Sequence, residues 1–234
     1  MGKIAVKNKT WTRDNFPVYL TYEHLDLDLR SRILDVGCGA GRLLNLLNYY
    51  GFKNLTGADV FIEQDIKYAN GVKIHKRELD DVEGTFDLIM FHHSLEHFVE
   101  PRAALKNAHS LLQKRKYCVV RIPVAAYAWE KYGRNWVQLD APRHINLFTE
   151  ASFRRMAREI GFDVENVVYD STAFQFVGSE QYVRDIPLAE SFEDSDTFLQ
   201  NLFGKEQLTE WGEEAEKLNA DHRGDQACFY LKKA

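Results

Sequence analysis

Apolar and polar residues follow two different periods along the first half of the chain. Strand-sized apolar runs occupy residues 32–36, 54–59, 71–75, 85–92 and 116–123. Between them, residues 42–51 and 101–114 place apolar side chains three and four positions apart, which is the spacing of a helix with one buried face. Strands and helices that alternate in this way form βαβ units. We therefore expect an α/β fold with a mostly parallel sheet and helices on both faces, preceded by a helix over residues 14–30.

The pattern changes after residue 123. Residues 124–147 form a long connection with many aromatic and polar residues, and long connections in compact domains are often functional. A helix over residues 149–160, with Thr149 as its N-cap, and a strand over residues 162–170 are predicted next. Residues 191–203 and 209–220 are acidic and amphipathic, as expected of helices with a solvated face, and residues 225–233 return to a strand pattern.

Composition excludes several classes of protein. The 234 residues carry a formal net charge of −5, so the chain offers no overall basic surface for a nucleic-acid backbone. Its three cysteines are an odd number and widely spaced, which favours a reduced, cytoplasmic protein with Cys118 and Cys228 as buried thiols. No apolar segment is long enough to predict a membrane span.

Three glycines, Gly37, Gly39 and Gly41, lie where the first predicted strand meets the first helix. Glycine permits a tight turn and the close approach of a ligand, and the N–H groups at the start of a helix attract polar ligands. A tight turn without a ligand is the alternative, but it does not need three alternating glycines. The dinucleotide-binding pattern G-x-G-x-x-G would place glycine at position 42, where this chain has Arg42.

The segment "ILDVGCGAGRLL" at residues 33–44 resembles motif I of the class I S-adenosylmethionine (SAM)-dependent methyltransferases. Further segments, "LEH" at 95–97 and "LDAPRH" at 139–144, resemble a bacterial subgroup of that family, many of whose members accompany polysaccharide or small-metabolite pathways. The resemblance implies a Rossmann-like, seven-stranded sheet whose last strand is antiparallel. It also implies SAM as cofactor and S-adenosylhomocysteine (SAH) as product.

One methyltransferase domain is expected to span residues 1–234. It would consist of an N-terminal helical segment (1–31), a core (32–122), a substrate-side loop (123–148) and the remaining core with a helical insertion (149–234). The predicted insertions therefore follow the fifth and sixth strands.

The resemblance also implies a set of cofactor-binding residues. Asp59, at the end of the second strand, occupies the position of the family's ribose-binding acid, and a carboxylate can accept hydrogen bonds from both hydroxyls of a ribose. Glu78 lies where the family often has an acid that contacts adenine, although Asp is commoner there, and Leu79 is expected to cover the adenine face. The full expected set is Asp35, Gly37, Cys38, Gly39, Gly41, Asp59, Val60, Glu78, Leu79, His92 and His93.

Methyl transfer from a sulfonium is an in-line displacement that needs an aligned acceptor and often a base to deprotonate it. Histidine suits that task near neutral pH. We expect His144 or His97 to be the base, with Asp140 or Glu96 orienting the imidazole. The expected catalytic residues are thus His144, His97 and Asp140, and the expected substrate-binding residues are Tyr127, Trp129, Trp136 and Arg143.

Each of these expectations has a plainer alternative. His97 would serve equally to stabilise the loop after the fourth strand, and Arg143 and His144 would serve to anchor their own loop. An aromatic cluster is as often core as it is a pocket wall. The predicted acceptor is a small molecule, with a hydroxyl of a sugar or another metabolite favoured over nucleic acid.

Other protein classes fit parts of the sequence. "HSLEH" at residues 93–97 spells H-x-x-E-H, a zinc-peptidase motif that requires both histidines on one helix. Here the motif directly follows a predicted strand, so no metal site is expected. An NAD-linked oxidoreductase is disfavoured because its loop pattern requires glycine at position 42, where this chain has Arg42. A non-catalytic SAM-binding partner protein stays open as an alternative.

Overall fold

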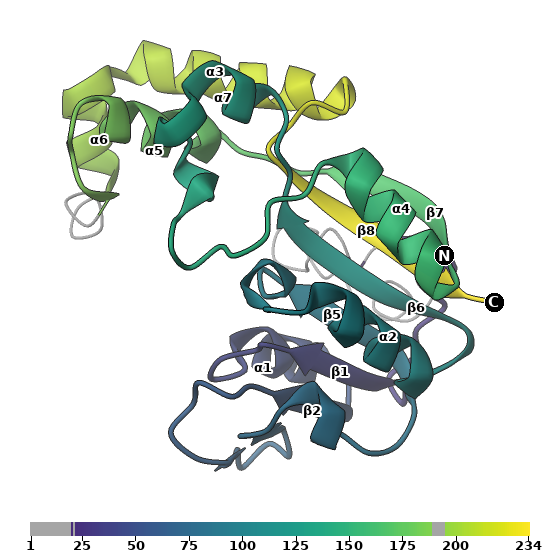
Figure 1. Cartoon of the computed structure of the whole chain (residues 1–234). Helices are drawn as coiled ribbons and strands as arrows, with labels where there is room; N and C mark the ends of the chain where they lie inside the picture. The colour runs from purple at the N-terminus through teal and green to yellow at the C-terminus, as the bar shows by residue number, and fades with distance from the viewer. Residues whose placement is uncertain (1–19, 21, 189–194) are drawn as a thin grey trace. The chain divides into compact units, whose positions relative to one another are not determined.

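The computed structural model describes residues 20, 22–188 and 195–234 (Figure 1). Most of the helix predicted over residues 14–30 lies outside the described residues. Within residues 22–30 that prediction is wrong, because they contain only the three-residue 3-10 helix η2 (Glu23–Leu25). Asp26 ends it in the left-handed conformation at φ 46°. Leu25, Leu27 and Leu29 alternate with polar residues, a period of two that gives no helical stripe.

The described strands form one sheet with the order β3-β4-β2-β1-β5-β6-β8-β7. Strand β1 pairs in parallel with β2 and β5, β2 with β4, and β5 with β6, whereas the strands at the C-terminal end are antiparallel. This confirms the predicted Rossmann-like α/β fold. The bounds are β1 (Arg32–Val36), β2 (Asn54–Ala58), β3 (Ile66–Lys67), β4 (Lys73–His75), β5 (Phe86–His92), β6 (Leu112–Pro123), β7 (Phe162–Tyr169) and β8 (Gln226–Lys233).

The eighth strand corrects the expected count of seven. Strand β3 contains two residues and pairs antiparallel with β4, with Ile66 opposite Ile74. It lies in the connection between β2 and β4, which are parallel neighbours. Such connections usually contain a helix, but the described residues 59–72 contain β3 and a turn instead.

Helices α1 (Arg42–Tyr49) and α2 (Pro101–Leu111) connect parallel strands. Helix α1 connects β1 to β2 and α2 connects β5 to β6, and these connections proceed in opposite directions along the sheet. Because such crossovers are right-handed, the two helices cover opposite faces (Figure 1). Consequently β1 and β5 are buried on both sides, and every residue of Ile33–Val36 and Leu88–Phe91 is buried.

The chain divides into two compact units. Unit 1 comprises Met1–Ile122, Arg154–Val167 and Phe229–Ala234, and unit 2 comprises Pro123–Phe153 and Val168–Cys228. The prediction of one methyltransferase domain over the whole chain remains a prediction.

The described residues contain five further α-helices and four further 3-10 helices. The α-helices are α3 (Tyr127–Tyr132), α4 (Glu150–Ile160), α5 (Phe174–Val183), α6 (Ser195–Phe203) and α7 (Lys205–Ala220). The 3-10 helices are η3 (Leu79–Asp81), η4 (Leu95–His97), η5 (Gly133–Asn135) and η6 (Val137–Leu139).

Helix α4 begins where the sequence predicts. The Ser152 N–H donates to Thr149 Oγ1 at 3.1 Å, and the Thr149 N–H donates back to Ser152 Oγ at 3.0 Å. This reciprocal pair satisfies N–H groups that the first helical turn leaves without partners. The predicted N-cap role of Thr149 is therefore confirmed.

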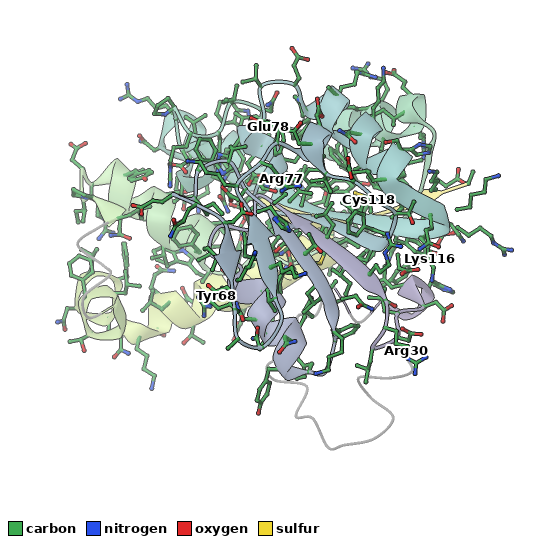
Figure 2. The ribbon with its side chains drawn as sticks, turned by 90° about the horizontal axis from the view of Figure 1, so that it is seen from below. Arg30, Tyr68, Arg77, Glu78, Lys116 and Cys118 are labelled. Atoms are coloured by element: carbon green, nitrogen blue, oxygen red, sulfur yellow. The ribbon has the colours of Figure 1, made fainter. Side chains whose placement is uncertain are left out.

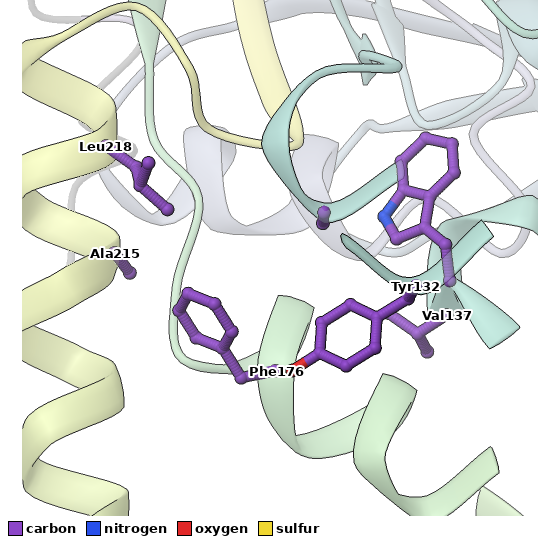
Figure 3. Packing of buried hydrophobic residues seen from close by; sticks show 7 residues of the cluster. Tyr132, Val137, Phe176, Ala215 and Leu218 are labelled. Atoms are coloured by element: carbon purple, nitrogen blue, oxygen red, sulfur yellow. The ribbon is translucent and has the colours of Figure 1, made fainter. Parts of the chain in front are cut away.

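A second hydrophobic core lies within unit 2 (Figure 3). Trp136 is fully buried there, and its indole N–H donates to Asp225 Oδ2 at 3.0 Å. Around it pack Ala128, Tyr132, Val137, Phe176, Ala215 and Leu218. Helix α5 escaped prediction because it is buried on several sides, including all of Gln175–Ser179, so its sequence has no one-sided apolar stripe.

The close contact between β2 and the glycine-containing loop gives a stability test. A Cβ added at Gly57 would lie 2.4 Å from Cys38 Sγ and 2.7 Å from Ile74 Cδ1. We expect Gly57→Ala to lower the free energy of unfolding by about 2 kcal/mol through overpacking. The matched control is Gly212→Ala in α7, where a Cβ meets no atom within 4 Å. This substitution should raise the free energy of unfolding by roughly 0.5–1 kcal/mol, because alanine is the better helix former. Urea denaturation of both variants checks this, and equal effects would contradict the packing argument.

Candidate functional site

The loop between β1 and α1 is built on three glycines with positive φ. The values are 72° at Gly37, 54° at Gly39 and 75° at Gly41. A Cβ at Gly37 would lie 2.5 Å from Ser94 Cβ, and one at Gly41 would lie 2.5 Å from Ile74 Cδ1. At Gly39 a Cβ would meet no protein atom within 4 Å. Packing thus requires glycine at the first and third positions, while the middle glycine faces open space.

Asp59 connects this loop to the end of β2. The Gly39 N–H donates to Asp59 Oδ2 at 2.7 Å, and the Phe61 N–H donates to Oδ1 at 2.7 Å. The Asp59 N–H in turn donates to the His75 carbonyl oxygen at 3.0 Å, which adds β4 to the arrangement. Each carboxylate oxygen can accept a further hydrogen bond. The carboxylate therefore has capacity left for a ligand.

A pocket of about 710 Å³ opens beside this loop, at the carboxyl ends of β1, β2 and β5. Its volume lies in the range of small-molecule sites, roughly 300–1,000 Å³. Figure 2 shows Arg77 and Glu78 at one end of the strands and Arg30 and Lys116 at the other. Of the residues predicted from the sequence, the lining includes Gly37, Gly39, Asp59, Val60, Glu78, Leu79, His93 and His97.

Four predicted cofactor residues are not in the pocket lining. Asp35 is buried in β1. Cys38 is half-buried within the loop with its Sγ against Gly57 of β2, and burial together with the carboxylates Asp35 and Asp59 raises the pKa of its thiol. Gly41 packs against Ile74. His92 lies beside Arg121 instead. Their placement is that of residues which support the loop and the strand ends.

The sequence did not single out several lining residues. Phe61 and Val99 follow β2 and η4 and are 90% and 75% exposed. Large apolar side chains in short polar loops after strands are an available signal for a binding site. Ser94 also lines the pocket, but its sequence gave no such signal, because its role depends on a residue 58 positions away. Its hydroxyl donates to the Val36 carbonyl oxygen at 2.6 Å.

The "HHSLEH" segment does not form the helix that a zinc peptidase requires. His93 has φ 52°, and only Leu95–His97 form a short 3-10 helix, so His93 and His97 do not lie one turn apart on a continuous helix. The segment therefore lacks the helix on which the zinc-peptidase alternative depends, as expected from the strand that the sequence predicts directly before it.

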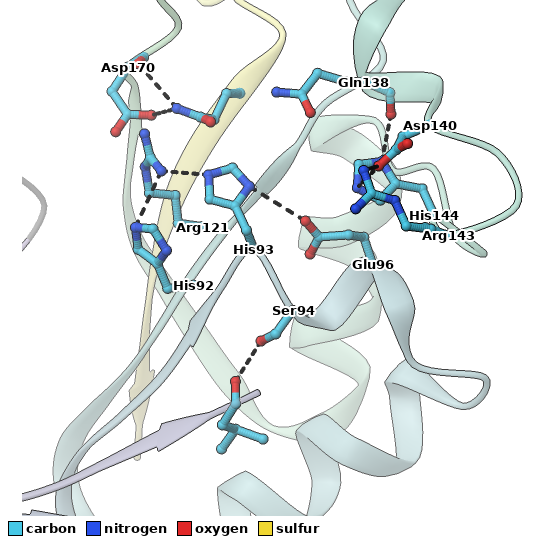
Figure 4. Close-up of polar contacts among 12 residues, drawn as sticks. His92, His93, Ser94, Glu96, Arg121, Gln138, Asp140, Arg143, His144 and Asp170 are labelled. Carbon is cyan, nitrogen blue, oxygen red and sulfur yellow. Dashed lines mark hydrogen bonds and ion pairs between the residues drawn. The ribbon is translucent and has the colours of Figure 1, made fainter. Parts of the chain in front are cut away.

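Arg121 on β6 holds both histidines at the end of β5 (Figure 4). Its Nη1 lies 3.3 Å from His92 Nε2 and 2.5 Å from His93 Nε2. A guanidinium only donates, so both Nε2 atoms accept. Burial, followed by the charges of His93 and Arg121, lowers the pKa of His92 to about 3. His93 then directs Nδ1 toward buried Glu96, whose Oε1 is 3.5 Å away.

Unit 2 brings together three residues of the "LDAPRH" segment. Arg143 Nη2 lies 2.5 Å from Asp140 Oδ2, and His144 Nε2 lies 3.7 Å from the same oxygen. His144 Nδ1 is 2.6 Å from the Gln138 carbonyl oxygen, which can only accept, so Nδ1 carries the proton in this contact (Figure 4). The predicted pairing of His144 with Asp140 therefore has a geometric basis within this unit.

The aromatic residues predicted to bind substrate occupy different surroundings in unit 2. Trp136 is fully buried in the core, and Trp129, which is 40% exposed, contacts its edge. Tyr127 lies under the Arg223 guanidinium, 5.4 Å from ring centroid to Cζ. Burial and the nearby Glu214 raise the pKa of the Tyr127 hydroxyl. The position of Trp136 is that of a structural residue.

The buried carboxyl of Asp35 gives a pH test. Burial, and next the charge of Asp59, raise its pKa from 3.8 to about 8. Between these values the folded protein holds a proton that the unfolded chain has lost, so this group makes stability fall as pH rises, by at most about 1.4 kcal/mol per pH unit. Asp35→Asn should flatten the slope between pH 5 and 8 in urea denaturation. Glu83→Gln, at an exposed site, is the control, and an unchanged slope for Asp35→Asn would contradict the assignment.

Comparison with solved structures identifies the fold. The cyclase SpnF matches with a TM-score of 0.58 and 18% identity, over 92% of this chain and 79% of that chain. A mycolic acid cyclopropane synthase, solved with SAH and CTAB, matches with a TM-score of 0.57 and 15% identity, over 92% and 82%. A SAM-dependent methyltransferase of Thermotoga maritima, described as a possible histamine N-methyltransferase, matches with a TM-score of 0.55 and 19% identity, over 92% and 89%.

No curated protein matches this chain. Among the described residues, no helix combines the length and apolar character needed to cross a membrane.

The family described as "Methyltransferase domain" matches residues 13–167, a stretch that contains the glycine loop, Asp59 and the pocket-lining loop after β5. The chain therefore belongs to this methyltransferase-domain family and is a SAM-dependent methyltransferase.

Proposed function

We propose that the unit 1 pocket binds SAM, and that the enzyme transfers its methyl group to a hydroxyl of a small metabolite such as a sugar. The observation that carries the cofactor assignment is the open space at Gly39, next to the Asp59 carboxylate. A side chain at Gly39 would occupy the space into which the pocket opens. Asp59 would bind the ribose hydroxyls, and Glu78 and Leu79 would contact the adenine.

The charge of the pocket supports a cationic cofactor. SAM supplies an electrophilic methyl group on a positively charged sulfonium. The residues that line the pocket include five with carboxylates and one with a guanidinium, an excess of negative charge that favours a cation. These residues are Asp59, Glu78, Asp80, Asp81, Glu100 and Arg77.

For the base we propose His97 or His144. His97 lines the pocket, whereas the Nε2 of His93 already accepts from Arg121 and His92 lies outside the lining. His144 is the second candidate, because Asp140 lies beside its Nε2 within unit 2. The base would remove the hydroxyl proton as the oxygen bonds to the methyl carbon and the carbon–sulfur bond breaks.

The acceptor assignment rests on the "LEH" and "LDAPRH" segments, which resemble enzymes of polysaccharide and small-metabolite pathways. The net charge of −5 also argues against a nucleic-acid acceptor. The proposed site of action is the cytoplasm.

Substitution of the middle glycine tests the cofactor site. Gly39→Ala should weaken SAH binding by at least about 10-fold, because its methyl group would occupy ligand space and an L-residue at this φ costs roughly 1–2 kcal/mol. Gly204→Ala in unit 2 is the matched control, since Gly204 has φ 81° and a Cβ there meets no atom within 4 Å. Calorimetry with SAH measures both. Wild-type affinity in Gly39→Ala would overturn the cofactor assignment.

The histidine proposal has a separate test. Loss of a general base typically lowers kcat by about 10²–10⁴-fold, so we expect that loss in His97→Ala or in His144→Ala, with SAH affinity within 2-fold of wild type. The assay measures SAH release in the presence of an acceptor identified by screening sugars and hydroxylated metabolites. Near wild-type turnover in both variants would remove histidine from the base role.

A further inference from the structure

The glycine loop is held from outside by side chains that the family resemblance did not single out. Tyr68 Oη donates to the Ala40 carbonyl oxygen at 2.7 Å. Asn45 Nδ2 donates to the Gly41 carbonyl oxygen at 3.0 Å, and Asn70 Nδ2 donates to Asn45 Oδ1 at 2.8 Å. Two consecutive carbonyl groups of the loop are therefore fixed by side-chain hydrogen bonds.

Tyr68 and Asn70 belong to the hairpin that joins β3 to β4, residues 66–75. The Tyr68 N–H donates to the Val72 carbonyl oxygen at 3.0 Å, and the Gly71 N–H donates to the Tyr68 carbonyl oxygen at 3.0 Å. Asn70 Oδ1 also accepts from the Val72 N–H at 3.1 Å. The hairpin is thus closed by its own hydrogen bonds, and it presents the Tyr68 hydroxyl from a defined backbone. Figure 2 shows Tyr68 at the outer part of the sheet.

The Ala40 carbonyl lies between Gly39 and Gly41, two residues whose backbone is free to adopt many conformations. A loop of this kind loses conformational entropy when it orders around a ligand, and a fixed carbonyl reduces that loss before the ligand arrives. The loop N–H groups at Gly37, Gly39 and Gly41 are occupied within unit 1, by the Ala58 carbonyl, the Asp59 carboxylate and the Cys38 carbonyl. The Tyr68 hydroxyl bonds to a different group of the same loop, the Ala40 carbonyl.

We propose that Tyr68 is a positioning residue for the cofactor, which fixes the glycine loop in its SAM-binding conformation through the Ala40 carbonyl. This inference rests on the proposed placement of SAM against Gly39. It assigns a role to the two-residue strand β3, which replaces the helix otherwise expected between β2 and β4 and carries Tyr68 to the loop.

The test compares two tyrosine hydroxyls of unit 1 in the full chain. Tyr68→Phe should raise the Kd for SAH by roughly 3- to 10-fold, the effect of losing one hydrogen bond that preorganises the site. The matched control is Tyr117→Phe, which removes a hydroxyl bonded to Glu165 Oε2 at 2.5 Å between β6 and β7. We expect both variants to lower the melting temperature, but only Tyr68→Phe to weaken SAH binding and to speed amide hydrogen exchange in residues 37–41.

A Kd for Tyr68→Phe within 2-fold of wild type, or an equal loss of affinity in Tyr117→Phe, would overturn the proposal. Gly39→Ala separates this failure from failure of the proposed function. If Gly39→Ala loses SAH binding while Tyr68→Phe keeps it, the cofactor site stands and the positioning role of Tyr68 falls. If neither substitution affects SAH binding, the cofactor is not bound against this loop and both proposals fall.

Discussion

The hydrogen bond from the Gly39 N–H to the Asp59 carboxylate is the contact on which the site depends. It joins the loop after β1 to the end of β2, and the Asp59 N–H joins both to β4 through the His75 carbonyl. The bond forms because Gly39 adopts φ 54°, a conformation that a larger residue would adopt only with strain. Three strand ends are thereby fixed around one side of the pocket.

The two carboxyl groups of Asp59 and Asp35 differ in their hydrogen bonding. Both oxygens of Asp59 accept backbone N–H groups, whereas Asp35 Oδ1 accepts no hydrogen bond from the described residues. Burial and the neighbouring Asp59 accordingly raise the pKa of Asp35 to about 8. The Asp35 carboxyl is thus enclosed within the sheet, whereas the Asp59 carboxylate lines the pocket and retains acceptor capacity for a ligand.

Strands β1 and β5 were predictable because their apolar runs reflect burial on both faces, and β1 matches its predicted bounds. The short strand β3 was not, although the Asn70-Gly71 pair in its hairpin is a known turn signal. Helix α2 ends at Leu111 rather than at residue 114, because Leu112 already belongs to β6. The sequence shows side-chain periodicity within an element, but not which neighbouring element will take its boundary residues.

Pocket-lining positions were predictable where they follow from the end of a strand, and not where they follow from contacts across the sheet. Gly37, Gly39 and Asp59 line the pocket because strand ends converge at one edge, and their role in cofactor binding stays a prediction. The contact of Ser94 with Val36 and the engagement of both histidines by Arg121 depend on which strands become neighbours. Spelling alone suggested a metal site at residues 93–97, whereas the backbone at His93 excludes the required helix.

The most direct test of the central claim is a crystal structure of the protein with S-adenosylhomocysteine. We expect the ligand to fill the pocket beside Gly39, with its ribose hydroxyls within hydrogen-bonding distance of the Asp59 carboxylate. Ligand density elsewhere in the protein, or a ribose that makes no contact with Asp59, would contradict it.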